Sequence, residues 1–385
     1  MSTLKVTNIN HASASTGGLA IDSSGVVTGA LPSPNRNLIY NGAMQVAQRG
    51  TSTASITTSG YYTADRINLV LSSLATWTQS VESDAPSGSG FRKSVKMLCT
   101  TSDAAPASGS ICLFGQRIEG QDLQRIAKGT ASAQQLTLSF WVKSNVTGTY
   151  VAELYDVDNT RQVSATYTVS ASATWEKKTI TFPADTTGAL DNDNAQSLQV
   201  WFGLAVGSNY SSGTLNTSWA STVNANRYVG QTNLAAATNN YWQITGVQLE
   251  VGPTATPFEF KSYGQELAEC QRYYYRIQPN GTQKALTPVG RNTGTTSAQF
   301  TGPFKVSMRT APTALEQSGT ATDYQINHRG IATQCSAVPT FGSSTTTEFF
   351  VINTTVASGL TDGDASLFTT DPGSSAGYLA WSAEL

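Results

Sequence analysis

The chain has 385 residues, of which 39% are hydrophobic and only 12% charged, and its net charge at pH 7 is −2. The charged share is about half of the roughly 25% that is typical of soluble domains, so Ser, Thr, Asn, Gln and Gly must form most of the surface. Such a surface is commoner in extracellular β-proteins than in cytosolic enzymes. No basic stretch offers a footprint for nucleic acid or for an anionic membrane, so we expect neither partner.

Residues 1–35 are expected to form an extended arm rather than a domain. Its beginning, MSTLKVTNINHASASTGG, lacks the apolar stretch of a secretory signal. No window of the chain approaches about 18 consecutive apolar residues, so we expect no membrane insertion. Further on, LAID-SSG-VVTG predicts a small hairpin, which a Pro-containing linker follows. Two such short strands are not stable alone in water, so the arm is either disordered or stabilised against another chain.

Residues 36–260 contain short strands at regular intervals, which predicts a jelly-roll-like β-sandwich. In QLTLSFWVKS the apolar side chains alternate with polar ones, and Trp141 falls on the polar side. In SLQVWFGLAVG the same alternation directs Trp201 away from the aliphatic face. Loops rich in Gly, Asn and Asp separate these strands, as turns require.

Residues 261–278 contain the one segment with helical spacing. Leu267, Cys270, Gln271 and Tyr274 follow one another at i, i+3, i+4 and i+7, which predicts a short helix from Gln265 to Arg276 with one mostly apolar stripe. A helix of about three turns is not stable alone in water, so the stripe needs a neighbour. We expect a junction that packs between the sandwich and the following domain, with copies of itself about a symmetry axis as a further neighbour.

Residues 279–385 are expected to form a second, smaller β-sandwich. QFTGPFKVSMRTAPTAL, EFFVINTTV and GYLAWSAEL are strand-like, and loops of Gly, Ser and Thr separate them. We find no repeat with a period of about 20 to 50 residues, so a β-helix or a propeller is not expected. The predicted fold class is therefore all-β.

We expect no cofactor and no metal. The four cysteines, Cys99, Cys112, Cys270 and Cys335, lack the spacing of metal ligands. Cys99 and Cys112 flank a loop on two predicted strands, and reduced thiols are favoured there over a disulfide. The acidic stretch at 191–194 could offer oxygens to Ca²⁺, but it lacks the glycine and the terminal glutamate of an EF-hand loop. An ordinary Asx-rich loop is the favoured interpretation.

We also expect no catalytic site. His11 and His328 lie in no nucleophile motif, and each is interpreted as a solvent-exposed histidine. A glycosidase would need only two carboxylates, and Glu153, Asp156 and Asp158 are the nearest approach to a cluster. A β-hairpin turn explains the same residues better.

Sugar binding is the most specific chemistry that the residues suggest. Sugars stack their apolar CH faces on aromatic rings while polar side chains bind the hydroxyls. If the strands of Trp141 and Trp201 are neighbours in one sheet, the two indoles form an exposed platform. The alternative is that a loop, the arm or a sister subunit covers them. Subunit-interface residues are expected in the junction, because tyrosine offers a large and rigid contact area; the candidates are Leu267, Cys270, Tyr273, Tyr274 and Tyr275.

Several segments resemble one family. NLIYNGAMQVAQRGTS followed by YYTADRI, then LTLSFWVKS, VQLEVGPTATPFEF, ELAECQRYYYR and VSMRTAPT, are similar to segments of tail-fibre and virion-fibre proteins of tailed bacteriophages, in the same order. The resemblance covers residues 37–315. It implies a carbohydrate-binding-module-like sandwich in a non-enzymatic, homotrimeric fibre or spike.

The resemblance also implies where such a chain works. It would be assembled in the host cytoplasm, leave by lysis and belong to the virion. Residues 1–35 would anchor it to other virion proteins, and the C-terminal domain would point outward to a glycan or another receptor on the host surface. Two alternatives stay open, namely a stand-alone carbohydrate-binding adhesin and a polysaccharide depolymerase.

Overall fold

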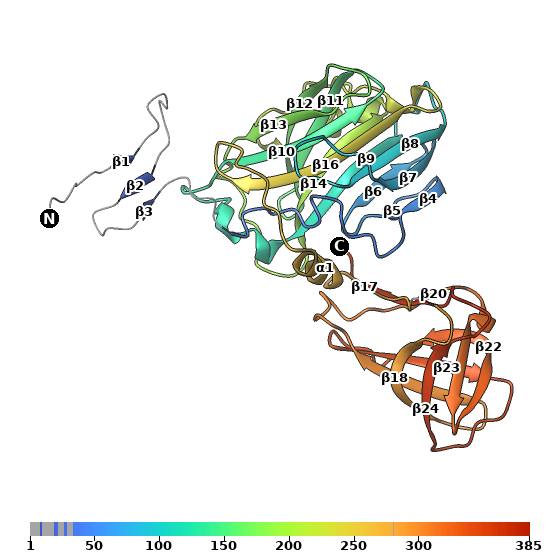
Figure 1. Ribbon diagram of the computed structural model, residues 1–385. Coiled ribbons are helices and arrows are strands. Elements are labelled where there is room, and N and C mark those ends of the chain that lie inside the picture. The colour runs from blue at the N-terminus through green and yellow to red at the C-terminus, as the bar shows by residue number, and fades with distance from the viewer. Residues whose placement is uncertain (1–7, 10–18, 22–26, 29–33, 280) are drawn as a thin grey trace.

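The computed structural model describes residues 8–9, 19–21, 27–28, 34–279 and 281–385. In this part of the chain the protein consists of antiparallel strands and loops with one α-helix, α1 (Tyr263–Gln271). Two lobes, a sandwich and a barrel, meet beside this helix (Figure 1). The all-β class is therefore confirmed. Within the described residues, no helix is long and apolar enough to cross a membrane.

The larger lobe is a sandwich of two antiparallel sheets. The six-stranded sheet has the order β13-β10-β16-β8-β7-β4, with β4 (Ser52–Ile56), β7 (Thr76–Glu82), β8 (Ser94–Thr101), β10 (Leu136–Ser144), β13 (Glu176–Phe182) and β16 (Tyr241–Val251). The seven-stranded sheet has the order β15-β12-β11-β14-β9-β6-β5, with β5 (Gly60–Tyr61), β6 (Asn68–Ser72), β9 (Ile111–Glu119), β11 (Gly148–Asp156), β12 (Arg161–Val169), β14 (Gln196–Val206) and β15 (Ala220–Ser221). Short 3₁₀ turns punctuate the loops: η1 (Gly120–Asp122), η2 (Gln124–Ile126), η3 (Ser208–Tyr210), η4 (Asn224–Asn226) and η5 (Leu234–Ala236).

The core between the two sheets follows from the alternation along the strands. Leu138 and Phe140 of β10 and Leu204 of β14 point inward and are buried, as the sequence predicts. All four cysteines are buried free thiols in the structure. Cys99 and Cys112 lie in opposite sheets of the sandwich, and burial raises the pKa of Cys99 to about 11.

Helix α1 is shorter than expected. The side chain of Ser262 caps its beginning by accepting a hydrogen bond from the backbone N–H of Gln265. The helix ends at Gln271 instead of running to Arg276, and Tyr274–Ile277 form strand β17. Aromatic and β-branched residues favour strands. Strand β25 (Leu379–Ser382), which lies near the C-terminal end of the chain, supplies the backbone hydrogen-bond partners of β17. Helical spacing within the segment could not reveal that distant partner.

The smaller lobe is a closed barrel, so the expected second sandwich is wrong. Its strand order is β18-β19-β23-β22-β21-β24, with β18 (Ala285–Asn292), β19 (Ser297–Pro303), β21 (Tyr324–His328), β22 (Ile331–Phe341), β23 (Phe349–Val356) and β24 (Ala365–Thr370). The turn η6 (Ala321–Asp323) precedes β21. Closure occurs because β18 pairs with β19 on one side and with β24 on the other, and register shifts along β18 and β22 let the sheet bend. A small sheet of β17, β25 and β20 (Glu316–Gln317) shares the barrel's core through Tyr275 and Trp381.

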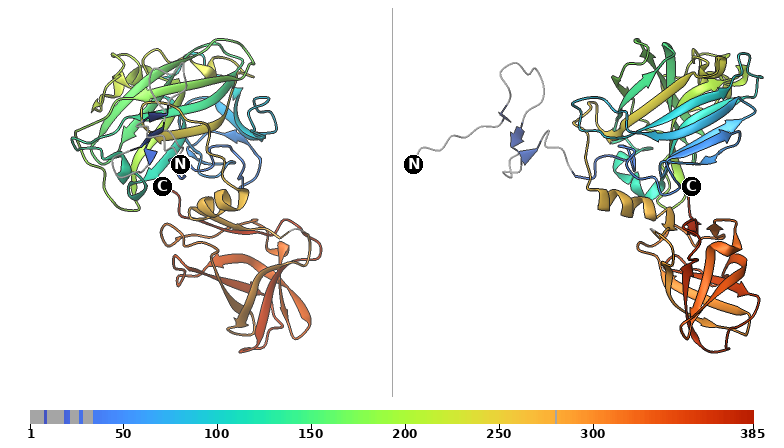
Figure 2. Two further views of the ribbon diagram at one scale, coloured as in Figure 1. Left: turned by 60° about the vertical axis from the view of Figure 1, so that its left-hand side comes forward. Right: turned by 45° about the vertical axis from the view of Figure 1, so that its right-hand side comes forward.

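The arm contributes a separate sheet of its own. Strands β2 (Leu19–Ile21) and β3 (Val27–Thr28) pair as the predicted hairpin, and β1 (Asn8–Ile9) adds a strand that the sequence did not predict. This sheet lies apart from the sandwich, while α1 lies between the sandwich and the barrel (Figures 1 and 2). The remaining residues of the expected arm up to residue 33 lie outside the described residues.

Candidate functional site

Trp141 and Trp201 lie on opposite outer faces of the sandwich, so they do not form a shared platform. Trp141 belongs to β10 of the six-stranded sheet and Trp201 to β14 of the seven-stranded sheet. Both point away from the core between the sheets, as predicted. The condition that their strands are neighbours in one sheet is not met, because alternation fixes the direction of a side chain but not the order of the strands.

Trp201 is buried although it faces outward. Only 2% of its surface is exposed, because segment 207–231 crosses the outer face of its sheet and packs Tyr210, Leu215 and Tyr228 around it. Its indole lies over Gly115 of the neighbouring strand β9, where an added Cβ would meet the ring at 2.6 Å. The indole N–H donates to Gln199 at 2.8 Å. Trp201 is therefore part of a small core, and the alternative that a loop covers this tryptophan holds.

Trp141 instead lines an open groove on the six-stranded sheet. The groove has a volume of about 360 Å³. Its lining combines aromatic rings with a few polar groups: Ser89, Phe91, Ser139, Trp141, Lys177, Gly246, Pro257, Phe258 and Phe260. Trp141 is half-buried, and its neighbours across the sheet are Lys177 on β13 and Thr245 on β16.

Three phenylalanines of the groove lining pack against one another. The ring centroids of Phe91, Phe258 and Phe260 lie 4.9 to 5.1 Å from one another, and Phe260 is 50% exposed. Segment 252–260 carries two of them back over the sheet, held by a 2.8 Å hydrogen bond from the backbone N–H of Glu259 to the side chain of Gln248. Phe91 is buried and Phe258 is half-buried, so the cluster opens to solvent at the ring of Phe260.

A glycine in the sheet makes room for this cluster. The pairing of β10 with β16 shifts register between Ser139 and Trp141, and Gly246 sits at the shift with a φ of +63°. A Cβ at Gly246 would meet the ring of Phe91 at 2.5 Å. The bulge therefore supplies both the left-handed backbone and the space over which Phe91 lies.

The charges at the groove are not balanced. Lys177 is exposed and has no ion pair among the described residues, and no carboxylate is among the lining residues. Lys143, two residues beyond Trp141 on the same face, pairs with Asp84 at 2.7 Å and is thereby neutralised. The groove can thus offer stacking surfaces, hydroxyl groups and one ammonium group, but no pair of carboxylates for acid–base chemistry.

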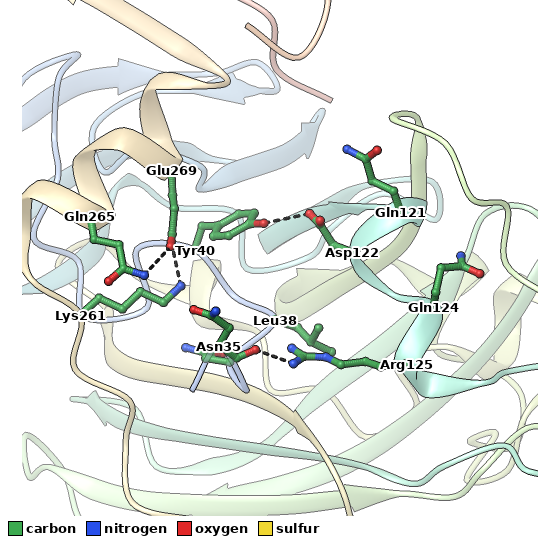
Figure 3. A pocket seen from close by; sticks show the side chains of 11 residues that line it. Asn35, Leu38, Tyr40, Gln121, Asp122, Gln124, Arg125, Lys261, Gln265 and Glu269 are labelled. Atoms are coloured by element: carbon green, nitrogen blue, oxygen red, sulfur yellow. Dashed lines mark hydrogen bonds and ion pairs between the residues drawn. The ribbon is translucent and has the colours of Figure 1, made fainter. Parts of the chain in front are cut away.

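A second cavity lies where the sandwich meets α1 (Figure 3). This polar pocket has a volume of about 540 Å³, and side chains of α1 and of η1–η2 face each other across it, with Tyr40 between them. Its polar groups are largely bonded to one another. Tyr40 donates its hydroxyl to Asp122 at 2.8 Å, and Lys261 pairs with Glu269 at 2.7 Å, while Gln265 donates to the same carboxylate at 3.1 Å.

Burial is the main cause of the shifted pKa values of Asp122 and Tyr40 in this pocket. Burial raises the pKa of Asp122, and the hydrogen bond from Tyr40 only partly offsets this rise. Burial, with the charge of Asp122, also raises the pKa of Tyr40 far above its usual value. Arg125 points its guanidinium at the backbone carbonyls of Asn35 and Arg36 and so ties this segment to η2. The pocket is held in shape by its own contacts and has a single aromatic ring, Tyr40, in its lining.

The carboxylates considered for catalysis have structural roles. Glu153 is buried and accepts hydrogen bonds from Arg227 at 2.7 and 2.8 Å and from Tyr228. Asp156 is buried and pairs with Lys128. Burial alone would lower the pKa of Arg227, but the hydrogen bond and the charge of Glu153 raise it above its usual value.

The two histidines were both expected to be exposed to solvent, and one of them is not. His328 is buried in the barrel, so its interpretation as solvent-exposed is wrong; β21 places it on the inner face. His11 lies outside the described residues. Among the residues that the structure describes, no three His, Cys, Asp or Glu side chains are grouped so as to hold a metal ion.

The expected interface residues form the junction within one chain. Tyr273 is buried under Arg66 and donates its hydroxyl to Glu119, which also binds Arg272 at 2.8 and 2.9 Å. Tyr274 lies beneath the guanidinium of Arg49 and donates to Glu316 at 2.9 Å, while Tyr275 packs in the barrel core.

The helix completes this junction between the lobes. Cys270 is also buried, and Leu267 is half-buried. These side chains therefore join the lobes of one chain and leave little surface for a second subunit. The contacts of the three tyrosines place this segment between the sandwich and the barrel, as expected.

Comparisons with known proteins assign no family. No family model matches the chain, and no curated protein matches its sequence. Among solved structures, the enzymatically active domain of tailspike protein 4 from bacteriophage CBA120 is similar at 16% identity and a TM-score of 0.30, over 58% of this chain and 22% of that chain. This chain thus spans about a fifth of the tailspike chain.

Two carbohydrate-binding modules are similar to a comparable extent. One is the family 11 module from Clostridium thermocellum, at 10% identity and a TM-score of 0.27, over 54% of this chain and 98% of that chain. The other is a xylan-binding domain from Paenibacillus barcinonensis, at 9% identity and a TM-score of 0.25, over 55% and 92% of the two chains. At these values the similarities assign neither family nor activity to this chain.

Proposed function

We propose that this chain is a non-enzymatic glycan-binding protein and that the groove at Trp141 is its binding site. The observation that carries the proposal is that the half-buried Trp141 and the exposed ring of Phe260 line one groove, together with two serines. Flat apolar rings bind the CH faces of sugars, and a few placed polar groups bind the hydroxyls. The buried ion pairs of Glu153 and Asp156 support a role without catalysis.

We further propose that the chain belongs to a bacteriophage fibre or spike, which attaches the virion to the host surface. The fibre-like segments between residues 37 and 315 and the small sheet at the N-terminal end support this role. A single groove of this size would bind weakly, and a trimer would multiply the contacts. Anchoring through residues 1–35 and trimer formation belong to the same proposal.

The glycan-binding proposal is tested with the full chain on an array of immobilised bacterial and plant polysaccharides. Trp141→Ala should raise the Kd of bound glycans about tenfold or more, since a stacking contact contributes about 1–2 kcal/mol. Phe260→Ala should weaken binding in the same direction. Phe349→Ala is the matched control, because Phe349 is 53% exposed, much like Phe260, but lies on the barrel. If Trp141→Ala and Phe260→Ala bind as the parent does, the groove is not the site.

The fibre proposal is tested separately by the native mass in solution. The chain weighs 40.7 kDa, so light scattering of a trimer should give about 122 kDa, three times that value. Deletion of residues 1–35 should abolish incorporation into particles but leave both lobes folded. A monomer that binds glycan through the groove would instead favour the stand-alone adhesin, and release of reducing ends from a bound polysaccharide would favour the depolymerase.

A further inference from the structure

The groove at Trp141 carries a cation that the protein itself leaves without a counter-ion. Lys177 lines the groove, is exposed and forms no ion pair with any described residue. The other lysines nearby behave differently, since Lys143 pairs with Asp84 at 2.7 Å and Lys178 pairs with Glu176 at 2.6 Å. The positive charge of Lys177 is thus available to a ligand.

We infer that the groove selects acidic glycans, in which the carboxylate or sulfate of one sugar binds the ammonium group of Lys177 while the ring stacks on an aromatic side chain. This inference rests on the proposed function of the groove and names its ligand class. No lining residue carries a negative charge that would repel such a ligand. A basic sugar would meet Lys177 as a like charge and be disfavoured.

Lys177 lies close enough to Trp141 for one sugar to contact both side chains. Lys177 and Trp141 are direct partners on the neighbouring antiparallel strands β13 and β10. Side chains of such partners begin about 5 Å apart on the same face of the sheet. A sugar stacked on Trp141 therefore lies within reach of the flexible lysine side chain, without any rearrangement of the sheet. The aromatic rings supply affinity for sugars in general, and the ammonium group supplies the preference among them.

The preference should be measurable but modest. An exposed ion pair contributes little in water, so we expect an acidic glycan to bind about fivefold more tightly than its neutral counterpart. The difference should shrink when NaCl is raised from about 0.05 M to about 0.5 M, because salt screens exposed charges. Stacking on the rings is not screened, so binding of the neutral glycan should change little over that range.

The experiment compares matched glycans on the full chain. The probes are oligogalacturonate and alginate, each beside its carboxyl-reduced neutral form, with sulfated carrageenan and its desulfated form as a second arm. Kd values are measured for the parent, Lys177→Gln, the matched control Lys143→Gln, and Trp141→Ala. Lys177→Gln should remove the preference for the acidic form and leave binding of the neutral form unchanged, whereas Lys143→Gln should keep the preference. The two arms show whether carboxylate or sulfate is the group that binds.

The outcomes separate this inference from the function on which it rests. Equal binding of the acidic and neutral forms by the parent, still abolished by Trp141→Ala, would overturn the acidic preference and keep glycan binding. A preference that survives in Lys177→Gln would also overturn the inference. If no probe binds, or if Trp141→Ala binds all of them as the parent does, the proposed function itself fails.

Discussion

The two outer faces of the sandwich each carry one outward-pointing tryptophan, and they differ in what covers it. On the seven-stranded sheet, segment 207–231 packs on Trp201 and turns that face into a third hydrophobic cluster. On the six-stranded sheet, segment 252–260 only flanks Trp141 and leaves a groove beside it. An aromatic ring lies over a glycine on both faces, Trp201 over Gly115 and Phe91 over Gly246. The same arrangement of ring and glycine is thus covered on one face and lies beside an open groove on the other.

The largest effect should come from the covered face. Trp201→Ala removes a fully packed indole and leaves a cavity under segment 207–231. We expect the free energy of unfolding of the sandwich to fall by about 3–5 kcal/mol. Urea unfolding followed by tryptophan fluorescence of the remaining residues measures this loss. A loss below about 1 kcal/mol would mean that the covered face is not a core and that the two faces are alike.

The next largest effect should come from the ion pair between Glu153 on β11 and Arg227 in segment 207–231. Glu153→Ala leaves Arg227 and Tyr228 without their shared acceptor at the sheet, which should cost about 3 kcal/mol. Hydrogen exchange of segment 207–231 should accelerate in the same variant, because Arg227 and Tyr228 belong to that segment. The control is Arg329→Ala, which breaks an exposed pair with Asp364 and should cost less than about 1 kcal/mol. Unchanged exchange in 207–231 would contradict the fastening role.

A smaller effect is expected from Gly246→Ala on the open face. The added Cβ meets the ring of Phe91, and the φ of +63° is unfavourable for alanine. We expect a loss of about 2 kcal/mol in the free energy of unfolding, with weaker glycan binding as Phe91 is displaced. Gly230→Ala is the matched control, since Gly230 has a φ of +86° but nothing within 4 Å of its added Cβ. Equal losses in both variants would show that the backbone alone matters and that Phe91 does not rest on Gly246.

The smallest change in stability should come from Trp141→Ala. Its ring is half-exposed on the groove wall, so its removal should lower the free energy of unfolding by about 1 kcal/mol or less. The same variant should lose glycan binding, and the contrast between the two measurements is the test. A stability loss as large as that of Trp201→Ala would make Trp141 a structural residue and erase the difference between the faces.

The sequence predicts local direction well because side-chain alternation is a property of each strand alone. Leu138, Phe140 and Leu204 point inward, and Trp141 and Trp201 point outward, as the period of two requires. Which strands are neighbours and which loop covers a face depend on contacts between distant segments. The platform of two tryptophans, the second sandwich and the helix through Tyr274 were wrong for that reason.

The groove itself could be found only in part from the sequence. Phe258 and Phe260 alternate in TPFEF after the last strand of the sandwich, which is a signal that two rings share one side of an extended segment. Phe91 follows the loop SGSG, and nothing near it in the sequence indicates that its ring meets theirs. The unpaired state of Lys177 is also invisible, since it depends on Asp84 and Glu176 pairing with other lysines.

The chain runs into the barrel through β17 and returns from it through β25, and these two strands are paired. Ile277 on β17 and Leu379 on β25 are partners in one ladder, so the residues between them form an insertion whose two ends lie side by side. A segment of this kind is an exchangeable cassette. Residues 278–378 also contact the rest of the chain, because Arg309 donates to the backbone carbonyl of Asn194 at 2.8 Å and Glu316 accepts from Tyr274 at 2.9 Å. A domain that replaced this segment would have to supply these contacts again. Exchange of this segment would leave the lining of the groove at Trp141 unchanged, because every lining residue lies outside residues 278–378.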